Sequence, residues 1–441
     1  MSIRGAFISV IAISTSAAAQ EPPDNAVPPV GTDVHSRAGP NPAVVYLMNQ
    51  YSLDEGEATK RIELQTAIGE LASQIQTSNE PSFAGVDIQH DPVFRIVVSF
   101  SEKKDRNEFI QSVEPRLRQY IQIRQVKRSR AAKRADLRKL ETALAGGQKP
   151  DFRAGEAPFI VNYDTSTQQF EILVETEEQR SKLSPLVPEE FADEATFSVG
   201  PLPKPSQSGP VGAQAGDWAT AGYTIYYAKS ETANRCTIGY SVRYGVNNTP
   251  AVITSAHCTL PQFLKYDGRW IELKSPLYKK WDNSHDFQVL DIGVMSTDSW
   301  VWAWEAEPIP EFDDQEWFQT VGRNSYYTQT KGTVVCKQGS ETGITCGQIR
   351  DVDNGYGGAY SQPWIEVSWT YQSDISKGGD SGGPWFVYPG SSQRIRAVGV
   401  HTAGGKKADG SSDTGYYSRA IYMPIERVFN NHPVNELIVS P

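Results

Sequence analysis

The sequence of 441 residues contains no apolar run long enough to cross a membrane. A spanning helix needs about 20 predominantly apolar residues, and the apolar run Ala6 to Ile13 is far shorter. Arg4 precedes this run and the small residues Ala17-Ala18-Ala19 follow it, which is typical of a cleaved secretory signal. We therefore expect a signal peptide over residues 1–19 and a secreted or periplasmic product.

Basic residues are in deficit, because 42 lysines and arginines stand against 52 aspartates and glutamates, a formal net charge of −10. Proteins that bind nucleic acid through their overall charge are usually basic, so this balance argues against that class. One basic stretch, Arg116 to Lys139, is an exception. Apolar residues interrupt it, and together with export this favours a solvated helix face over a nucleic-acid site. Its cations include Lys127, Arg128, Arg130, Lys133 and Arg134.

Cysteine is scarce, and the four cysteines have neither Cys-x-x-Cys nor paired histidine spacing. This argues against a structural metal site, and we expect no metal and no cofactor. In an exported chain an even number of cysteines indicates disulfides. Four cysteines allow three connectivities, and pairing of neighbours is preferred, because Cys236 and Cys258 lie on either side of a predicted strand-turn-strand and a short glycine-containing loop separates the other two. The expected disulfides are Cys236–Cys258 and Cys336–Cys346.

The chain is too long for one ordinary core, so two or three folded units are expected. A Pro-rich spacer covers residues 20–43. Beyond it, the segments 83–106 and 157–180 both show a strand, an Asp-containing turn, a strand and a polar helix start. Residues 44–200 are therefore predicted to be an α+β region with two similar lobes, and Leu64, Ile68, Leu71 and Ile75 recur there at helical spacing.

A segment rich in Pro, Gly, Ser and Gln, residues 201–216, is the best candidate linker. Exposed segments of this composition are also where proteolytic cleavage concentrates. After it, the sequence changes to many short β-rich runs separated by turns. This texture predicts an all-β domain, a sandwich or barrel, over residues 217–441.

The strongest chemical motif is KGGDSGGPW, Lys377 to Trp385. A nucleophilic serine needs a bent backbone that exposes its hydroxyl while nearby amides point at one spot, and glycine permits that geometry. We expect Ser381 to be the nucleophile and the amides of Gly379 and Ser381 to form the oxyanion hole. A plain glycine-rich turn is the alternative, and the dense motif around a single Asp-Ser pair disfavours it.

A histidine ends an apolar strand in TSAHC, Thr254 to Cys258. A disulfide at Cys258 would hold His257 rigidly, as a general base must be held, although a lone histidine is more often structural. A carboxylate has to orient the imidazole, and two are candidates. Asp291 in DIGVM lies within an apolar strand, where a buried carboxylate needs a donor, and is the expected partner. Asp286 in SHDFQVL has a more polar setting, which favours an exposed loop residue.

The order His, Asp, Ser with TSAHC, DIGVM and GDSGGP resembles the chymotrypsin-like serine proteases. The segments CTIGYSV and VCKQGSETGITCGQI are most similar to the bacterial streptogrisin and alpha-lytic protease branch. The resemblance implies two six-stranded antiparallel β-barrels with the active site between them, and a triad of His257, Asp291 and Ser381. It also implies that residues 44–200 are a pro region that assists folding and inhibits the enzyme until it is removed. Asp380 would maintain the oxyanion-hole loop.

The same resemblance locates the pocket for the side chain before the scissile bond. Ile375 takes the position of the pocket floor, so a preference for Lys or Arg is not favoured. His401 stands where glutamate-specific relatives carry a histidine, which predicts an acidic or amide side chain in the substrate. The alternative is a buried histidine bonded within the barrel, beside an apolar or small-residue pocket. The remaining expected pocket residues are Ser376, Thr402 and Gly404.

These observations predict a secreted serine endopeptidase that is made as a zymogen and acts on proteins or peptides. The linker contains no glutamate. Either the enzyme accepts a broader range of residues before the scissile bond and cuts its own linker, or another protease cuts it. A protease-shaped binding protein without catalysis is the competing function, disfavoured because all three triad positions are filled. An esterase is a third alternative, since the same acyl-transfer chemistry cleaves esters.

Overall fold

The computed structural model describes most of the chain from residue 41 onward. The described residues are 41–147, 158–203 and 219–439, apart from 166, 231–233, 260–261, 267–268, 275, 293–296, 298, 305–314, 355, 357–363, 369–374, 391–393 and 406–415. The predicted signal peptide, most of the Pro-rich spacer and most of the linker lie outside them. Within these residues no helix is both long and apolar enough to span a membrane.

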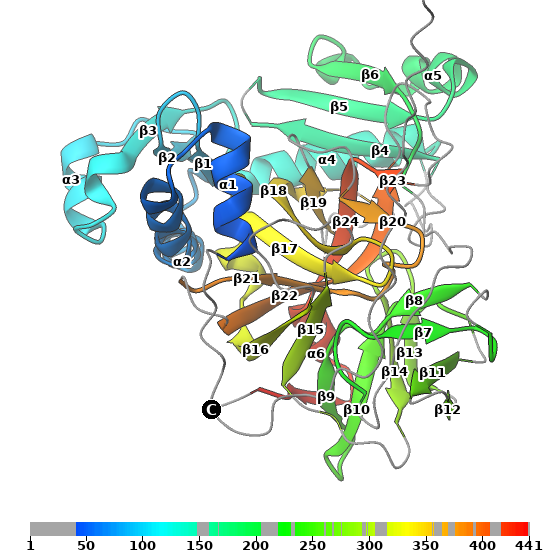
Figure 1. The fold of residues 1–441 in the computed structure, drawn as a ribbon. Helices are drawn as coiled ribbons and strands as arrows, with labels where there is room; N and C mark the ends of the chain where they lie inside the picture. Colours follow the sequence, from blue (N-terminus) through cyan, green and yellow to red (C-terminus); the bar gives the residue numbers. More distant parts are fainter. Residues whose placement is uncertain are drawn as a thin grey trace, which may run out of the picture.

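An α+β region of one leading helix, α1 (Pro42–Tyr51), and two lobes comes first (Figure 1). The first lobe consists of α2 (Glu55–Thr77), β1 (Phe83–Gln89), β2 (Arg95–Phe100), α3 (Arg106–Ser112) and β3 (Ile121–Gln125). The second lobe repeats this order with α4 (Arg130–Leu144), β4 (Phe159–Asp164), β5 (Gln169–Val174), α5 (Glu177–Leu183) and β6 (Ala195–Val199). In each lobe the first two strands are antiparallel and the last two parallel, so both sheets have one topology. Short 3-10 helices are η1 (Arg118–Tyr120), η2 (Ser184–Leu186) and η3 (Glu189–Phe191).

Polar residues begin the main helices of these lobes. Asp54 accepts a hydrogen bond from the Glu57 amide at the start of α2, and Ser129 accepts one from Ala132 at the start of α4. These side chains satisfy amides that have no partner within the helix. Each helix then packs its apolar side on the sheet of its own lobe. The cores contain Leu64, Ile68, Leu71, Ile96 and Val98 in the first lobe, and Leu137, Leu140, Val161, Phe170 and Ile172 in the second.

A closed six-stranded barrel forms the centre of the molecule (Figure 1). Its strands follow the order β22-β21-β17-β18-β19-β24, and β24 pairs back onto β22. Two further strands, β15 (Trp300–Trp304) and β16 (Gln315–Arg323), extend from β22, and β20 (Ser376–Lys377) pairs with β23 (Tyr416–Tyr417). The 3-10 helix η4 (Tyr326–Thr328) follows β16. The barrel strands are β17 (Val334–Gly339), β18 (Gly343–Asn354), β19 (Trp364–Ser368), β21 (Pro384–Val387), β22 (Arg394–Gly405) and β24 (Arg419–Pro424).

The other β half precedes the barrel in sequence and consists of two antiparallel sheets. The order of the five-stranded sheet is β13-β14-β10-β9-β25, and that of the four-stranded sheet is β12-β11-β7-β8. The last strand, β25, returns to this half after the short helix α6 (Glu426–Phe429). The strands are β7 (Thr224–Tyr226), β8 (Arg235–Thr237), β9 (Ser241–Tyr244), β10 (Thr249–Thr254), β11 (Gln262–Tyr266), β12 (Arg269–Leu273), β13 (Pro276–Trp281), β14 (Asp286–Asp291) and β25 (Val434–Leu437).

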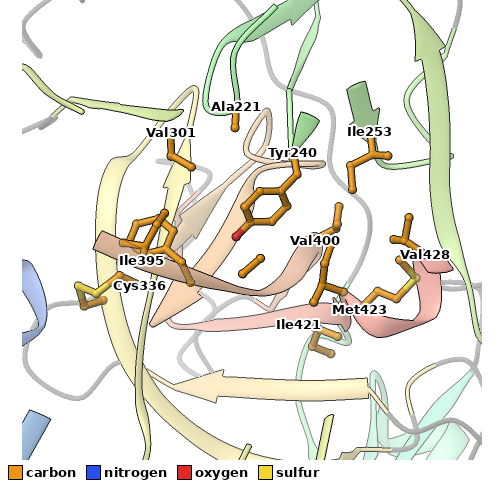
Figure 2. Close-up of a cluster of buried hydrophobic side chains, with 14 of the residues drawn as sticks. Ala221, Tyr240, Ile253, Val301, Cys336, Ile395, Val400, Ile421, Met423 and Val428 are labelled. Atoms are coloured by element: carbon orange, nitrogen blue, oxygen red, sulfur yellow. A yellow bond between two sulfur atoms is a disulfide. The ribbon is translucent and has the colours of Figure 1, made fainter. Parts of the chain in front are cut away.

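The two β halves share an apolar junction, which Figure 2 shows. Tyr240 and Ile253 of the first half face Val400 and Met423 of the barrel, and all four are buried. The Tyr240 hydroxyl donates to the Trp385 carbonyl at 2.5 Å, so a hydrogen bond also joins the halves. Because close packing tolerates little change in shape, the junction fixes the halves relative to each other.

This architecture confirms the predicted fold class, an all-β double-barrel domain preceded by an α+β region. Within the described residues one half is a closed sheet of six strands, while the other is divided into sheets of five and four. The α+β region contacts the six-stranded barrel, with α1 on β17 and β18 and β4 on β18.

Candidate functional site

The turn after β10 carries His257 at the junction of the two β halves. Its neighbour Cys258 forms a disulfide with Cys236 of β8, and both cysteines are fully buried. His257 itself is 5% exposed. The second disulfide joins Cys336 to Cys346, residues directly opposite each other in β17 and β18. Both predicted disulfides are therefore confirmed, and the first anchors the histidine turn as expected.

The carboxylate that holds His257 is Asp286, the first residue of β14. Its Oδ2 lies 2.7 Å from His257 Nδ1, and its Oδ1 accepts the His257 amide at 3.0 Å. Asp286 is fully buried. These two contacts orient the ring and leave Nε2 as the nitrogen available for proton transfer. Nε2 is buried and has no hydrogen-bond partner among the described residues.

The interpretation of Asp291 as the partner of His257 is wrong. Asp291 ends β14, is partly exposed, and forms an ion pair with Lys274 at 3.7 Å. In the register of the sheet it lies opposite Ala251, while Thr254 lies opposite Gln288. β10 therefore runs toward the beginning of β14, and the turn that follows it meets Asp286. The polar neighbours of Asp286 in sequence suggested exposure, but the fold buries it.

A tight turn presents Ser381 beside the histidine turn. Gly379 and Gly382 have φ values of 108° and 90°, in the region that favours glycine. A Cβ atom at Gly382 would clash with the Thr254 side chain and the Thr237 carbonyl. The Ser381 carbonyl accepts the Thr237 amide at 2.8 Å. This contact brings the serine turn directly against β8 and the end of β10, and Ser381 is 2% exposed.

The amides of this turn divide into two groups. Those of Asp380, Gly382 and Gly383 donate to the carbonyls of Lys377, His401 and Asp380. No hydrogen bond among the described residues uses the amides of Gly379 and Ser381. These are the two amides that the sequence analysis expected to form an oxyanion hole, and both lack a hydrogen-bond partner in this part of the structure.

Asp380 fixes the turn, because its buried carboxylate accepts hydrogen bonds from several donors. The Lys337 ammonium lies 2.7 Å from Oδ2, and the Thr342 hydroxyl and the Lys377 amide also donate to this oxygen. Burial alone would raise the pKa of Asp380, but Lys337 and the hydrogen bonds outweigh burial and hold this pKa below its usual value. Ionised Asp380 therefore stabilises the folded protein above about pH 4, where an aspartate of the unfolded chain is also ionised. This stabilisation is lost as the pH falls further and Asp380 is protonated.

His401 is buried in the barrel and keeps one ring nitrogen occupied. The Trp385 indole donates to His401 Nδ1 at 3.2 Å. An indole N–H can only donate, so Nδ1 is an acceptor and the ring proton is on Nε2. Burial, with the nearby Lys337 ammonium, lowers the pKa of His401 to about 3, so the ring is neutral at physiological pH. Trp385 in turn stacks on Tyr422, whose hydroxyl donates to Gln329.

The other predicted pocket residues are all buried but differ in their surroundings. Ile375 packs in the barrel core with Val335 and Val367, and its carbonyl accepts the Thr345 hydroxyl at 2.9 Å. The hydroxyls of Ser376 and Thr402 are buried without a partner in the described part of the chain. Gly404 lies opposite Ala420 in the β22–β24 ladder. Buried polar atoms are nearly always paired, so each of these two hydroxyls has the capacity to bond a ligand.

Sequence analysis considered Asp286 but preferred Asp291, and it gave no role to Lys337 or Trp385. Lys337 had one usable signal, since it is the single charged residue in the otherwise uncharged β17. A further group, Cys236, His257 and Cys258, has its potential ligand atoms close together. Both sulfurs are engaged in the disulfide, so this group is not a metal site.

We predict that Lys337→Met destabilises the protein by about 3–5 kcal/mol, because it leaves the Asp380 carboxylate buried without its cation. Lys274→Met is the matched control, since that lysine is 68% exposed and its ion pair with Asp291 is a surface one. It should cost less than about 1 kcal/mol. Urea unfolding of both variants measures the difference, and equal midpoints would contradict a structural role for the buried pair.

Comparison with known proteins yields structural neighbours. No family model matches the chain, and no curated protein matches it. Among solved structures it is similar to Thermobifida fusca protease A, with 19% identity and a TM-score of 0.33 over 51% of this chain and 100% of that one. Nocardiopsis protease matches with 17% identity and a TM-score of 0.34 over 50% and 98% of the two chains. Cellulomonas bogoriensis chymotrypsin matches with 18% identity and a TM-score of 0.33 over 51% and 100%. These neighbours are bacterial serine proteases, similar at low identity over half of the chain.

Proposed function

We propose that the chain is a serine endopeptidase with a catalytic triad of Ser381, His257 and Asp286. One observation carries the proposal: a buried carboxylate holds one nitrogen of a buried imidazole, while the other nitrogen lacks a partner in the described structure. The glycine-rich turn, whose Gly379 and Ser381 amides are unused among the described residues, lies against the turn that carries this imidazole, with the Ser381 carbonyl 4.0 Å from Cys258 Sγ. General base, nucleophile and oxyanion donors therefore occupy one site, which is the arrangement that acyl transfer requires.

Each group has a defined task in this mechanism. Ser381 Oγ attacks the scissile carbonyl while His257 Nε2 takes its proton, and Asp286 holds the imidazole and stabilises the imidazolium that forms. The amides of Gly379 and Ser381 donate to the oxyanion of the tetrahedral intermediate. His257 then protonates the leaving amine, the peptide bond breaks, and an acyl-enzyme remains on Ser381. Water, deprotonated by His257, hydrolyses this ester and restores the serine.

The chain is proposed to be exported and made as a precursor. Two disulfides accord with folding in an oxidising compartment. Residues 44–200 would act as a pro region and the segment 201–216 as the place of cleavage, with the catalytic domain beginning near 217. Inhibition of the uncut chain stays a prediction. No hydrogen bond or ion pair in the described structure joins residues 41–203 to His257, Asp286 or Ser381.

Ser381→Ala tests the function directly. We expect the exported wild-type chain to react with a serine-directed phosphonate probe and to mature to a fragment that begins near residues 210–220, as followed by mass spectrometry. The variant should neither react nor mature. If both mature alike and only the wild type reacts, the enzyme is active and another protease cuts it. If the wild type reacts neither as the full chain nor after cleavage of the linker with both segments still together, the competing binding-protein function is favoured.

The identity of the acid is tested by Asp286→Asn against Asp291→Asn. We expect Asp286→Asn to lower the rate of phosphonate labelling by about 10⁴-fold, because an amide no longer fixes the productive histidine tautomer. Asp291→Asn is the matched control at the other end of the same strand, and it should label within about twofold of the wild type. The opposite order of effects would restore Asp291 as the catalytic acid.

Substrate preference is proposed to depend on His401. A neutral imidazole with its proton on Nε2 can donate to a carboxylate or to an amide oxygen, so both Glu and Gln would be accepted before the scissile bond. The Trp385 indole enforces this tautomer by donating to Nδ1. The buried Ser376 and Thr402 hydroxyls could supply further hydrogen bonds. An apolar or small-residue preference remains the alternative, since Ile375 contributes its side chain to the core rather than a charge.

Trp385→Phe should weaken the preference for Glu and Gln over Leu by about tenfold to a hundredfold, because the imidazole loses the donor that fixes its tautomer. A peptide panel that varies only the residue before the scissile bond measures this ratio. Reaction with the phosphonate probe serves as the control for an intact triad. No preference of the wild type for Glu, Gln or Asp would contradict the role of His401.

A further inference from the structure

The N-terminal α+β region covers part of the six-stranded barrel with an apolar surface. Residues Pro42 to Leu47 of α1 are all buried. Val44 and Leu47 belong to one apolar cluster with Val334 and Phe386 of the barrel. A shared core of this kind is typical of permanent interfaces, whereas transient ones are smaller and more polar.

The backbones of the two parts approach closely at two points. A Cβ atom at Gly69 of α2 would lie 2.5 Å from the Thr328 carbonyl oxygen of the barrel domain. A Cβ atom at Gly332 would clash with the carbonyl of Ile88 in the first lobe. Around the second point the Ile88 amide donates to the Lys331 carbonyl at 2.7 Å. The surfaces fit with no room for an added methyl group at either glycine.

A buried charge cluster adds polar specificity to this surface. Asp353 of β18 is 1% exposed and pairs with Arg130, Lys133 and Arg134 of α4, at 3.3, 2.5 and 2.7 Å. Burial would raise the pKa of Asp353, but the three cations outweigh it and hold this pKa well below its usual range. The expectation of a solvated helix face is therefore wrong for Arg130 and Lys133. The basic helix is a docking element for a single aspartate of the barrel.

The barrel segment that receives these contacts is the hairpin of β17 and β18. The α+β region reaches it from both lobes and from α1, through hydrogen bonds that are spread along its length. They are Val334 N to Gln65 Oε1 (2.5 Å), Tyr51 Oη to Gln348 Oε1 (2.9 Å), Arg350 Nη2 to Glu171 Oε2 (2.9 Å) and Asn354 Nδ2 to Asn162 Oδ1 (2.9 Å).

The other contacts of the same hairpin hold the serine turn and the pocket. Lys337 of β17 pairs with Asp380 at 2.7 Å, and the Ser340 hydroxyl donates to the Gly379 carbonyl at 2.8 Å. Thr345 of β18 donates to the Ile375 carbonyl. One two-stranded element therefore connects the α+β region to the groups around Ser381.

We propose that residues 41–203 stay bound to the barrel after the linker is cut and keep the β17–β18 hairpin in the arrangement that positions Asp380 and Gly379. The active enzyme is then a complex of two chain segments, and the N-terminal segment is its permanent partner. The predicted effect on activity rests on the proposed protease function. The predicted retention of residues 41–203 on the barrel does not depend on that function.

The experiment uses the full chain with the recognition sequence of a site-specific protease inserted after Ser208. After cutting, the two segments are followed by size-exclusion chromatography at decreasing concentration, and each fraction is treated with the phosphonate probe. We expect both segments to elute together and to react. The two segments of the cut Arg130→Ala/Arg134→Ala variant should separate at protein concentrations at least tenfold higher than those at which the segments of the cut wild type separate. Labelling by the phosphonate probe should fall in parallel with separation.

Arg138→Ala is the matched control, because Arg138 is an exposed arginine of the same helix. It should behave as the wild type. Thermal unfolding of the uncut variants verifies that they fold, since the intact linker keeps both segments together at high effective concentration. If the C-terminal segment separates and reacts at the wild-type rate, the proposal is wrong and the protease function stands. If the segments stay together and no form reacts, the protease function fails while retention is supported.

Discussion

The buried carboxylate of Asp380 fixes the turn that carries Ser381. Asp380 is fully buried, and its charge is matched by the equally buried Lys337. Two such groups are stable only together, because each alone would be an uncompensated charge in a medium of low dielectric. The pair therefore fixes β17 relative to the turn after β20. In that fixed position the turn holds Ser381 against the turn that carries His257. The amides of Gly379 and Ser381 have no hydrogen-bond partner among the residues that the structure describes.

Local sequence motifs predicted the parts of the site that depend on local geometry. Ser381 was recognisable because a strained turn requires glycines on both sides of it, and His257 because a cysteine beside it implied an anchored loop. The acid could not be chosen in this way. Asp286 and Asp291 lie at the two ends of the same apolar strand, and the antiparallel pairing of β14 with β10 decides which end meets the histidine. Three strands lie between β10 and β14 in sequence, so no local pattern specifies this pairing.

The fold was predictable to a similar degree. Helical spacing and strand alternation were enough to predict two lobes and an all-β region, since these patterns reflect which side of each element is buried. Partners that are distant in sequence were not predictable. Arg130 and Asp353 are separated by 223 positions, and a cation at a helix surface looks the same in sequence whether it faces water or a buried aspartate. Trp385 and His401 likewise meet only because β21 and β22 are neighbours in the barrel.

The strand β25 has a consequence for the order in which this protein can fold during synthesis. It pairs with β9 at the edge of the five-stranded sheet, although the whole six-stranded barrel lies between these strands in sequence. A ribosome therefore releases the first β half before the strand that completes its edge has been made. That edge, with its unpaired backbone groups, is exposed while the barrel is synthesised, and exposed edges invite pairing with other chains. The first β half completes its edge only after the barrel has been made, so the two halves reach their native structure as one unit rather than one after the other.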